Sequence, residues 1–308
     1  MQMGRTSCPT SMESLRMVSG NLANISLSAP EHERLDIQAM ALNKLVQGEP
    51  FRAPVQGPKK ILDIGCGTGI LTVQLAKKFP DAQVIGLDIS PVPDIHDHPS
   101  NVEYIQGDFL ELADGQDARL VPGTFDYVFS RLLHFGVKDW PRYVSSVLKV
   151  LAPGGWAEIQ ENAPGVPRKP NGEVNHELQQ LKNFRVVLED FSAVGLDLAV
   201  PGKLPGWFRD SGFVDIRNFT FKFPITKPLP TQTESKSERE AAEFLYEYHQ
   251  KYILPMMGTV LDKLSRTLRG EEATNEGSRS FSEWQSQAAA EPGTYVDFTI
   301  VVGQKPLQ

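Results

Sequence analysis

The sequence predicts an α/β protein built on a mostly parallel β-sheet. Short apolar segments of strand length alternate with segments whose apolar residues recur at helical spacing. Such alternation implies right-handed crossovers between parallel strands. Five strands of this kind are expected at residues 61–64, 84–88, 102–105, 125–129 and 156–159. Two later strand-like segments, 213–216 and 295–302, would complete a seven-stranded Rossmann-like sheet.

The helices expected around this sheet fall into two groups. An amphipathic helix is predicted over Glu31–Gln47, and helical stripes at 71–79 and 143–151 follow the first and fourth strands. In the second half, apolar spacing predicts a long helix over 178–191 and another over 244–252. We expect these later helices to cover the ligand-binding edge of the sheet. Residues 270–292 are polar and rich in Ser, Glu and Ala, which predicts an exposed loop or mobile connection.

Composition narrows the class of protein. The chain has 308 residues, of which 40% are hydrophobic and 22% charged, as in ordinary globular proteins with a buried core. A net charge of -7 and a pI near 5.5 argue against a dedicated nucleic-acid-binding protein, because such proteins present a basic face to phosphates. The sequence therefore predicts no nucleic-acid partner.

Cysteine use and the lack of apolar runs indicate a soluble protein inside the cell. Cys8 and Cys66 are the two cysteines, and we expect both to be reduced. The first residues show neither a secretion nor a myristoylation signal, and no apolar run approaches the roughly 20 residues of a membrane span. A cytoplasmic location with no membrane partner is expected.

A glycine-rich loop marks the expected ligand site. Asp63-Ile64-Gly65-Cys66-Gly67-Thr68-Gly69 follows the first strand and opens a helix, so backbone amides can approach a ligand at the helix N-terminus. A dinucleotide fingerprint would need glycine at position 70, where the chain has Ile70. A P-loop would need Gly-Lys-Ser/Thr, which does not follow. The run instead suits a cofactor without a pyrophosphate, with Asp63 facing a cationic amino group.

Two further acids stand at the ends of the next strands. Asp88 ends the second strand, where a carboxylate can accept both hydroxyls of a ribose. Asp108 follows the third strand and can accept from an adenine amino group, while Phe109 offers the ring an apolar face. Taken alone, each of these acids could be an ordinary solvated carboxylate at the end of a loop. Three acids in order around a glycine loop favour a nucleoside-containing ligand.

These motifs resemble those of the class I S-adenosylmethionine-dependent methyltransferases. The resemblance rests on residues 61–69, 84–90, 107–109 and 151–156. A narrower resemblance, to the LaeA-like methyltransferases of filamentous fungi, rests on 33–36, 125–127, 138–141, 153–156, 206–207 and 212–215. It covers about residues 31–225. Where that family carries a segment rich in Arg and Tyr, this chain has Ser14–Ser19.

The resemblance implies S-adenosylmethionine as the cofactor and assigns the residues that bind it. These residues are Asp63, Gly65, Cys66, Gly67, Gly69, Asp88, Ile89, Asp108, Phe109 and Arg131. Arg131 could cover the cofactor carboxylate or cap the following helix. We expect a flexible leader over 1–30 and a single methyltransferase domain over 31–308. Within it, the cofactor-binding half spans about 59–162, the helical substrate-covering region about 172–292, and the last strand about 295–303.

The catalytic prediction concerns His134. Methyl transfer from a sulfonium is mostly a matter of positioning, and a base is needed only when an alcohol or phenol must lose a proton. His134 follows the fourth strand and has a pKa suited to a base, although a hydrogen-bonded structural histidine fits the segment as well. Glu161 could meet the substrate or lie in solvent. His96-Asp97-His98 is interpreted as a polar loop without metal, and His176 and His249 as exposed helical residues.

The sequence therefore predicts methyl transfer to a hydroxyl, amine or thiol of a hydrophobic small-molecule secondary metabolite. An alternative is a cofactor-binding regulator of secondary metabolism that acts through protein partners, and would be nuclear. A third alternative uses the cofactor as an electrostatic aid to a rearrangement. Methylation of DNA bases is disfavoured, since Ser130-Arg131-Leu132-Leu133 replaces the expected Asn/Asp-Pro-Pro-aromatic motif. A homodimer is left open, as is the choice of aromatic residues lining an acceptor pocket.

Overall fold

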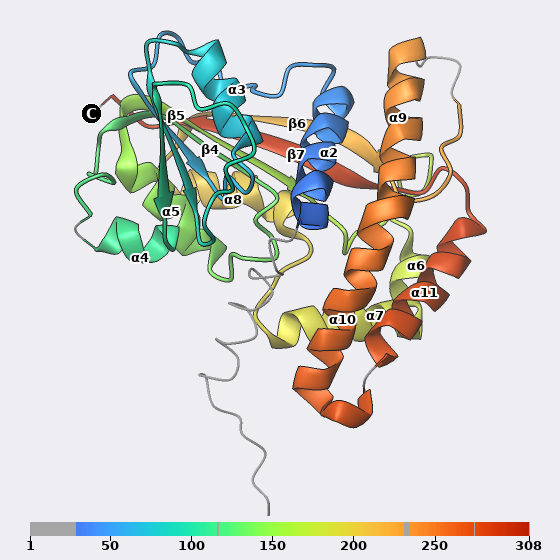
Figure 1. Cartoon of the computed structure of the whole chain (residues 1–308). Helices are drawn as coiled ribbons and strands as arrows, with labels where there is room; N and C mark the ends of the chain where they lie inside the picture. Colours follow the sequence, from blue (N-terminus) through green and yellow to red (C-terminus); the bar gives the residue numbers. More distant parts are fainter. Residues whose placement is uncertain (1–28, 116, 231–234, 274, 308) are drawn as a thin grey trace, which may run out of the picture.

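The computed structural model describes residues 29–115, 117–230, 235–273 and 275–307. Cys8, the Ser14–Ser19 segment and nearly all of the expected 1–30 leader lie outside these residues. One seven-stranded sheet crosses the molecule in the order β3-β2-β1-β4-β5-β7-β6 (Figure 1). Its strands are β1 Lys60–Ile64, β2 Gln83–Asp88, β3 Val102–Gln106, β4 Phe125–Arg131, β5 Leu151–Asn162, β6 Val214–Pro224 and β7 Tyr295–Gln304.

The sheet is mostly parallel, which confirms the predicted fold class. β1 pairs in parallel with β2 and β4, and the parallel pairing extends to β3 and β5. β7 lies antiparallel between β5 and β6. Because β1, β2 and β4 lie side by side and point the same way, their carboxyl ends meet at one edge of the sheet.

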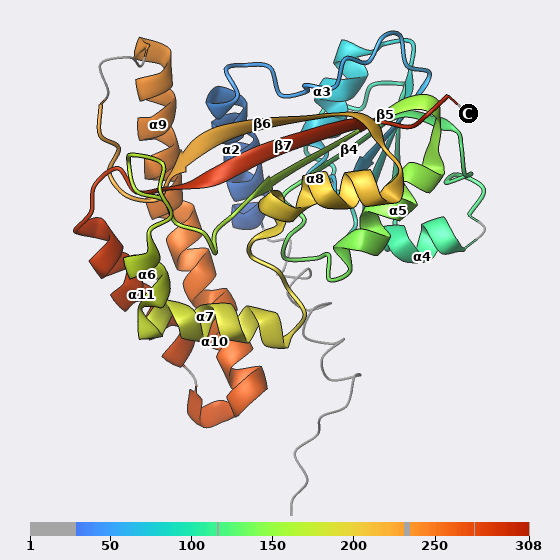
Figure 2. The ribbon, with the colours of Figure 1, turned by 180° about the vertical axis from the view of Figure 1, so that it is seen from behind.

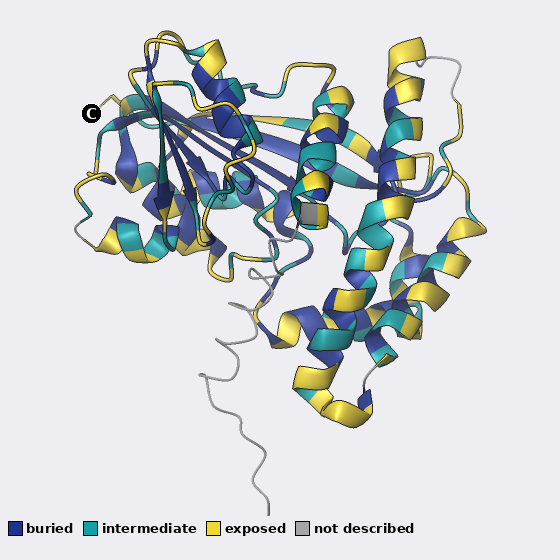
Figure 3. Ribbon diagram, viewed as in Figure 1, coloured by how far each residue is buried: buried dark blue, intermediate teal, exposed yellow. Residues whose placement is uncertain are grey.

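Helices cover both faces of the sheet. α4 (Phe109–Asp114), α5 (Trp140–Val150) and α8 (Val200–Ser211) pack on one face, which Figure 2 shows from behind. α2 (Ala29–Leu45) and α3 (Ile70–Lys78) lie on the other face. The inner strands β1, β4, β5 and β7 are largely buried between these layers (Figure 3).

The remaining helices lie beside the sheet. Among them, α9, η1 and α10 follow one another as one nearly continuous helix. These elements are α6 His176–Gln180, α7 Lys182–Ala193, α9 Lys236–Tyr248, π-helical η1 His249–Ile253, α10 Leu254–Arg269, 3-10 helix η2 Glu271–Ala273 and α11 Glu276–Ala289. α7, α10 and α11 pack on one another, with Phe184 stacked on Trp284 at 4.6 Å. No helix among the described residues is long and apolar enough to cross a membrane.

Three predictions about the second half were wrong. The segment 270–292 is not an exposed loop, since α11 buries Phe281, Trp284 and Ala288 against its neighbours. The long helix expected over 178–191 is broken at Leu181 into α6 and α7. His249 is buried in η1 rather than exposed, and burial lowers its pKa to about 4. His176 is exposed as expected.

Candidate functional site

A cavity of about 610 Å³ opens at the edge where the parallel strands end. Such a volume is typical of sites for drug-sized ligands. Its wall is built from the glycine loop, the segments that follow β2, β3 and β4, helix α2 and one residue of α10. The described lining residues on these segments include Glu31, Arg34, Leu35, Gln38, Ala39, Asp63–Thr68, Asp88–Ser90, Gly107–Glu111, Arg131–Leu133, Phe135–Asp139 and Met256.

The glycine loop is held against the second strand by backbone contacts. Gly65 and Cys66 donate to the carbonyl of Leu87, and the Gly67 amide donates to Asp88 Oδ2 at 2.9 Å. Gly67 has φ +57°, which favours glycine, and a Cβ there would meet only Leu35 Cδ1 at 3.6 Å. The protein thus has room at Gly67, and the substituent would project into the cavity wall.

Gly69 is needed for a different reason. A Cβ at this position would overlap the hydroxyl of Tyr104, which packs against the loop from β3. Gly69 does not line the cavity, unlike Gly65, Cys66 and Gly67. The third glycine therefore lets Tyr104 pack beneath the loop.

Asp63 is the deepest acid of the site. Its side chain is buried at the end of β1 and accepts a hydrogen bond from Thr72 Oγ1 at 2.6 Å. Burial raises the pKa of Asp63 to about 7, although Thr72 and the nearby Arg131 oppose the rise. A cation placed beside Asp63 would favour the ionised form.

Backbone amides fix the position of the Asp88 carboxylate, which lines the cavity. Its Oδ1 accepts from the Ser90 amide and its Oδ2 from the Gly67 amide, each at 2.9 Å. Burial raises the pKa of Asp88, and these amide contacts oppose the rise. Each oxygen retains a further lone pair that can accept from a ligand hydroxyl. Ile89 follows with 40% of its surface exposed.

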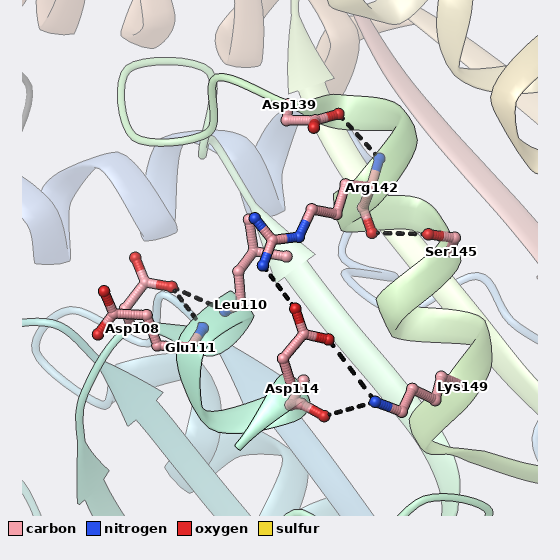
Figure 4. Close-up of polar contacts among 9 residues, drawn as sticks. Asp108, Leu110, Glu111, Asp114, Asp139, Arg142, Ser145 and Lys149 are labelled. Carbon is pink, nitrogen blue, oxygen red and sulfur yellow. Dashed lines mark hydrogen bonds and ion pairs between the residues drawn. The ribbon is translucent and has the colours of Figure 1, made fainter. Parts of the chain in front are cut away.

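Asp108 caps α4 at the far end of the cavity. Its Oδ1 accepts from the amides of Leu110 and Glu111, at 2.7 Å and 3.1 Å (Figure 4). Arg142 of α5 pairs with Asp114 of α4 at 2.5 Å, and so ties the two helices together beside the cap. Phe109 is buried on α4 and lines the cavity.

Arg131 is the last residue of β4, and its guanidinium group is only partly hydrogen-bonded among the described residues. Its Nε donates to Gln160 Oε1 at 2.7 Å, and its Nη1 donates to Asn43 Oδ1 at 3.3 Å. Nη2 is buried without a hydrogen-bond partner in the described part of the chain. Burial lowers the pKa of Arg131 to about 10, so it stays charged at neutral pH. A buried, charged donor without a partner is costly, and a carboxylate ligand would satisfy it.

His134 stands apart from these residues. It is buried and does not line the cavity, whereas its neighbours Leu133 and Phe135 do. Its Nδ1 lies 2.8 Å from Oε2 of Glu161, and Oε1 of Glu161 accepts from the Leu133 amide at 2.5 Å. Glu161, expected to face substrate or solvent, is fully buried. This placement favours the structural interpretation of His134 over the general base.

We expect replacement of His134 by alanine to destabilise the protein by about 1–3 kcal/mol, because the buried Glu161 would lose a partner. Binding of the cofactor product should be unchanged. Urea unfolding followed by circular dichroism measures the effect, and the exposed His176→Ala is the matched control. A general base would give the opposite pattern, with normal stability and a loss of about 10²–10⁴-fold in turnover of a hydroxyl acceptor.

Sequence reasoning missed the contribution of α2 and α10. Asp36 of α2 accepts from the glycine-loop residue Thr68, Oδ1 to Oγ1 at 2.6 Å, and lies 3.2 Å from His96 Nε2. Arg34 and Leu35 line the cavity, as does Met256 of α10. The motif at 33–36 was a sequence signal for the contribution of α2. No local pattern pointed to Met256 of α10.

The His96-Asp97-His98 segment makes separate polar contacts. Asp97 pairs with Lys77 and His98 with Asp94. The described residues contain no group of three or more His, Cys, Asp or Glu arranged to hold a metal ion.

A comparison with known proteins identifies the domain. Residues 61–155 match the family described as methyltransferase domain. Residues 61–155 therefore form a methyltransferase domain, and the sheet around it has the class I methyltransferase fold. The match begins at β1 and ends within β5, so it contains the glycine loop and the cavity residues Asp63, Asp88 and Asp108.

Relatives of this chain include fungal proteins. Methyltransferase pytC of Aspergillus terreus is 27% identical over 63% of this chain and 58% of its own length. Secondary metabolism regulator laeA of Coprinopsis cinerea is 37% identical over 33% of this chain and 24% of its own length. The chain therefore spans less than two thirds of the length of these relatives, and it resembles the LaeA-like proteins.

A solved structure shares the fold. Phosphoethanolamine N-methyltransferase 2 of Haemonchus contortus, in complex with S-adenosyl-L-methionine, matches with a TM-score of 0.54 and 20% identity. The match covers 94% of this chain and 60% of that one.

Proposed function

We propose that this chain transfers the methyl group of S-adenosylmethionine to a hydroxyl, amine or thiol of a hydrophobic small molecule of secondary metabolism. The observation that carries the proposal is the common cavity of Asp63, Asp88 and Asp108, which end or follow successive strands around a glycine loop. The fungal relatives named for methyltransferases and for secondary metabolism support the acceptor class.

The contacts of the cofactor follow from the chemistry of each wall. Asp88 accepts the ribose hydroxyls, and Asp108 accepts from the adenine amino group. Phe109 and Ile89 pack against the adenine ring, and Gly65, Cys66 and Gly67 approach the ligand through their backbone. Gly69 acts indirectly, by admitting Tyr104. These assignments use groups that line the cavity, Gly69 excepted.

The methionyl end carries an ammonium and a carboxylate, and Asp63 and Arg131 match them. Asp63 would face the ammonium, and the unused Nη2 of Arg131 would donate to the carboxylate. The two side chains come from neighbouring strands, since Asp63 pairs in register with Phe129, two residues before Arg131. Because Asp63 and Arg131 carry opposite charges and lie two residues apart in the strand register, they suit the two charged groups of a zwitterion.

We expect cofactor affinity to rise with pH between about 6 and 7.5. The raised pKa of Asp63 leaves it largely neutral below about 7 in the free protein, and a bound ammonium favours its ionised form. Binding near pH 7 should therefore release a proton. Calorimetry with S-adenosylhomocysteine in buffers of different ionisation enthalpy measures this release.

Asp63→Asn keeps an oxygen for Thr72 and should abolish the proton release. Asp81→Asn, at an exposed aspartate, should leave it unchanged. Release that persists in Asp63→Asn would assign the titration to another group, with Asp88 as the next candidate.

The structure of the domain supports one unit over 31–308, with the cofactor-binding half at about 59–162 and the helical region at about 172–292. β6 and β7, from the second half, pair in the same sheet as β1–β5. We place the enzyme in the cytoplasm, with a small molecule as its substrate and no nucleic-acid or membrane partner.

A regulator that binds the cofactor and acts through protein partners is the second candidate, because several relatives carry the name of a regulator. The two candidates differ in turnover. S-Adenosylmethionine with an isotopically labelled methyl group is mixed with the protein and the small-molecule extract of its source. The enzyme transfers label to a small molecule, and Asp88→Ala loses this transfer. Cofactor binding without any transfer of label would favour the regulator.

A further inference from the structure

One side of the cavity is not used by the proposed cofactor contacts. It is lined by Leu35 and Ala39 of α2, by residues of the 132–137 segment after β4 other than His134, and by Met256 of α10. Apart from Glu31, Arg34 and Gln38 at its α2 end, the described lining residues here have apolar side chains or none. The inference drawn from this region rests on the proposed function.

Two contacts place this region beside the glycine loop. Leu35 of α2 stands at Gly67, where a Cβ would lie 3.6 Å from its Cδ1. Leu133 stands at Gly65, where a Cβ would overlap its side chain. The two leucines therefore flank the part of the glycine loop that we assign to the cofactor.

The segment after β4 is fixed in a strained conformation. Leu132 has φ +56°, in the left-handed region that non-glycine residues rarely adopt, at a cost of about 1–3 kcal/mol. Its amide donates to the carbonyl of Gln160 at 2.8 Å, and Phe135 stacks on Phe191 at 5.4 Å. Strain of this kind persists where surrounding contacts hold it, and it is common at ligand sites.

The charged groups of this region neutralise each other. Arg34 donates to both carboxylate oxygens of Glu31, from Nε at 2.8 Å and from Nη2 at 2.7 Å. Its Nη1 donates to the hydroxyl of Tyr248 on α9 at 3.0 Å, and only 8% of Arg34 is exposed. Of the lining residues on α2, Leu132–Val137 and α10, these two are the charged ones. Lys138 and Asp139, the next lining residues along the chain, again bring one charge of each sign.

We infer that this region is the acceptor site and that it selects an uncharged, aromatic or otherwise apolar acceptor. An ionised acceptor would be buried without a counter-charge, because Glu31 and Arg34 already satisfy each other. An uncharged acceptor instead gains from apolar contact with Leu35, Phe135 and Met256. Its polar edge can hydrogen-bond the exposed atoms of the Glu31–Arg34 pair.

Three probes of the same ring system test the charge selection. Protein saturated with S-adenosylhomocysteine is titrated at pH 7 with 2-naphthol, with 2-naphthoate and with 2-naphthylmethylammonium. We expect 2-naphthol to bind at least about tenfold more tightly than either ion. Equal or tighter binding of an ion by the wild-type protein would overturn the inference.

A pair of tryptophan substitutions tests the location. Met256→Trp fills the region and should lower 2-naphthol affinity by at least about tenfold, with S-adenosylhomocysteine affinity retained. Met40→Trp is the matched control, since Met40 lies on α2, is 51% exposed and does not line the cavity. Binding of 2-naphthol that Met256→Trp leaves unchanged would place the site elsewhere.

Glu31→Gln tests the ion pair directly. The substitution keeps the shape of the side chain but leaves the Arg34 charge without a counter-charge. We expect 2-naphthoate affinity to rise by at least about tenfold while 2-naphthol affinity changes little. An unchanged 2-naphthoate affinity in Glu31→Gln would contradict the inference. The proposed function fails separately, if the wild-type protein does not bind S-adenosylhomocysteine.

Discussion

Replacing Asp88 with alanine is expected to weaken S-adenosylhomocysteine binding by at least about tenfold. The carboxylate accepts two ribose hydroxyls in our assignment, and charge-assisted hydrogen bonds contribute about 1.5–3 kcal/mol each. The substitution also frees the amides of Gly67 and Ser90, which Asp88 now holds. Isothermal titration calorimetry measures the change in affinity.

Asp81→Ala is the matched control for this prediction. Asp81 is exposed in the turn before β2 and does not line the cavity. Its replacement should leave the affinity as in the wild-type protein. Unchanged affinity in Asp88→Ala would remove the ribose assignment.

Gly67→Val should have a larger effect and reduce cofactor binding by at least about 100-fold. A β-branched residue is strained at φ +57°, and its side chain would project toward Leu35, into the space of the ligand. A Cβ meets no other side chain within 4 Å, so we expect the fold to persist. Calorimetry and the thermal unfolding midpoint separate binding from folding.

Cys66→Ser provides the control within the same loop. Cys66 is buried, burial raises the pKa of its thiol, and only its backbone is assigned to the ligand. The variant should therefore bind the cofactor normally. A folded Gly67→Val protein with wild-type affinity would mean that the ligand does not approach this loop.

The first half of the fold could be predicted because its signals are local. β1, β2 and β4 are buried on both faces, so each appears as a short apolar run. The acids at 63 and 88 come directly at the ends of such runs. Parallel pairing then brings these ends to one edge, so the side of the cavity that we propose for the cofactor could be expected from order along the chain.

The second half could not be predicted as well, because tertiary packing decides it. α11 is rich in Ser, Gln and Glu, and the few apolar residues that it buries against α7 and α10 give a weak periodic signal. His249 lies in a polar stretch, yet η1 turns it inward toward Phe223, at 6.3 Å between ring centroids. Neither outcome is visible in a local window.

The acceptor side of the site depends on contacts between distant segments. Arg34 and Tyr248 are separated by 214 positions, and Met256 reaches the cavity from α10. His134 shows the converse. Its position after β4 suggested a base, whereas Glu161 on the neighbouring strand holds it in the interior.

Titration of the wild-type protein with S-adenosylhomocysteine tests the central claim most directly. If the cavity at the ends of β1, β2 and β4 is a cofactor site, calorimetry will show one site per chain with an affinity of about micromolar order. The same titration of Asp88→Ala and Gly67→Val will show weaker or no binding. Absence of binding by folded wild-type protein at about millimolar ligand would contradict the account.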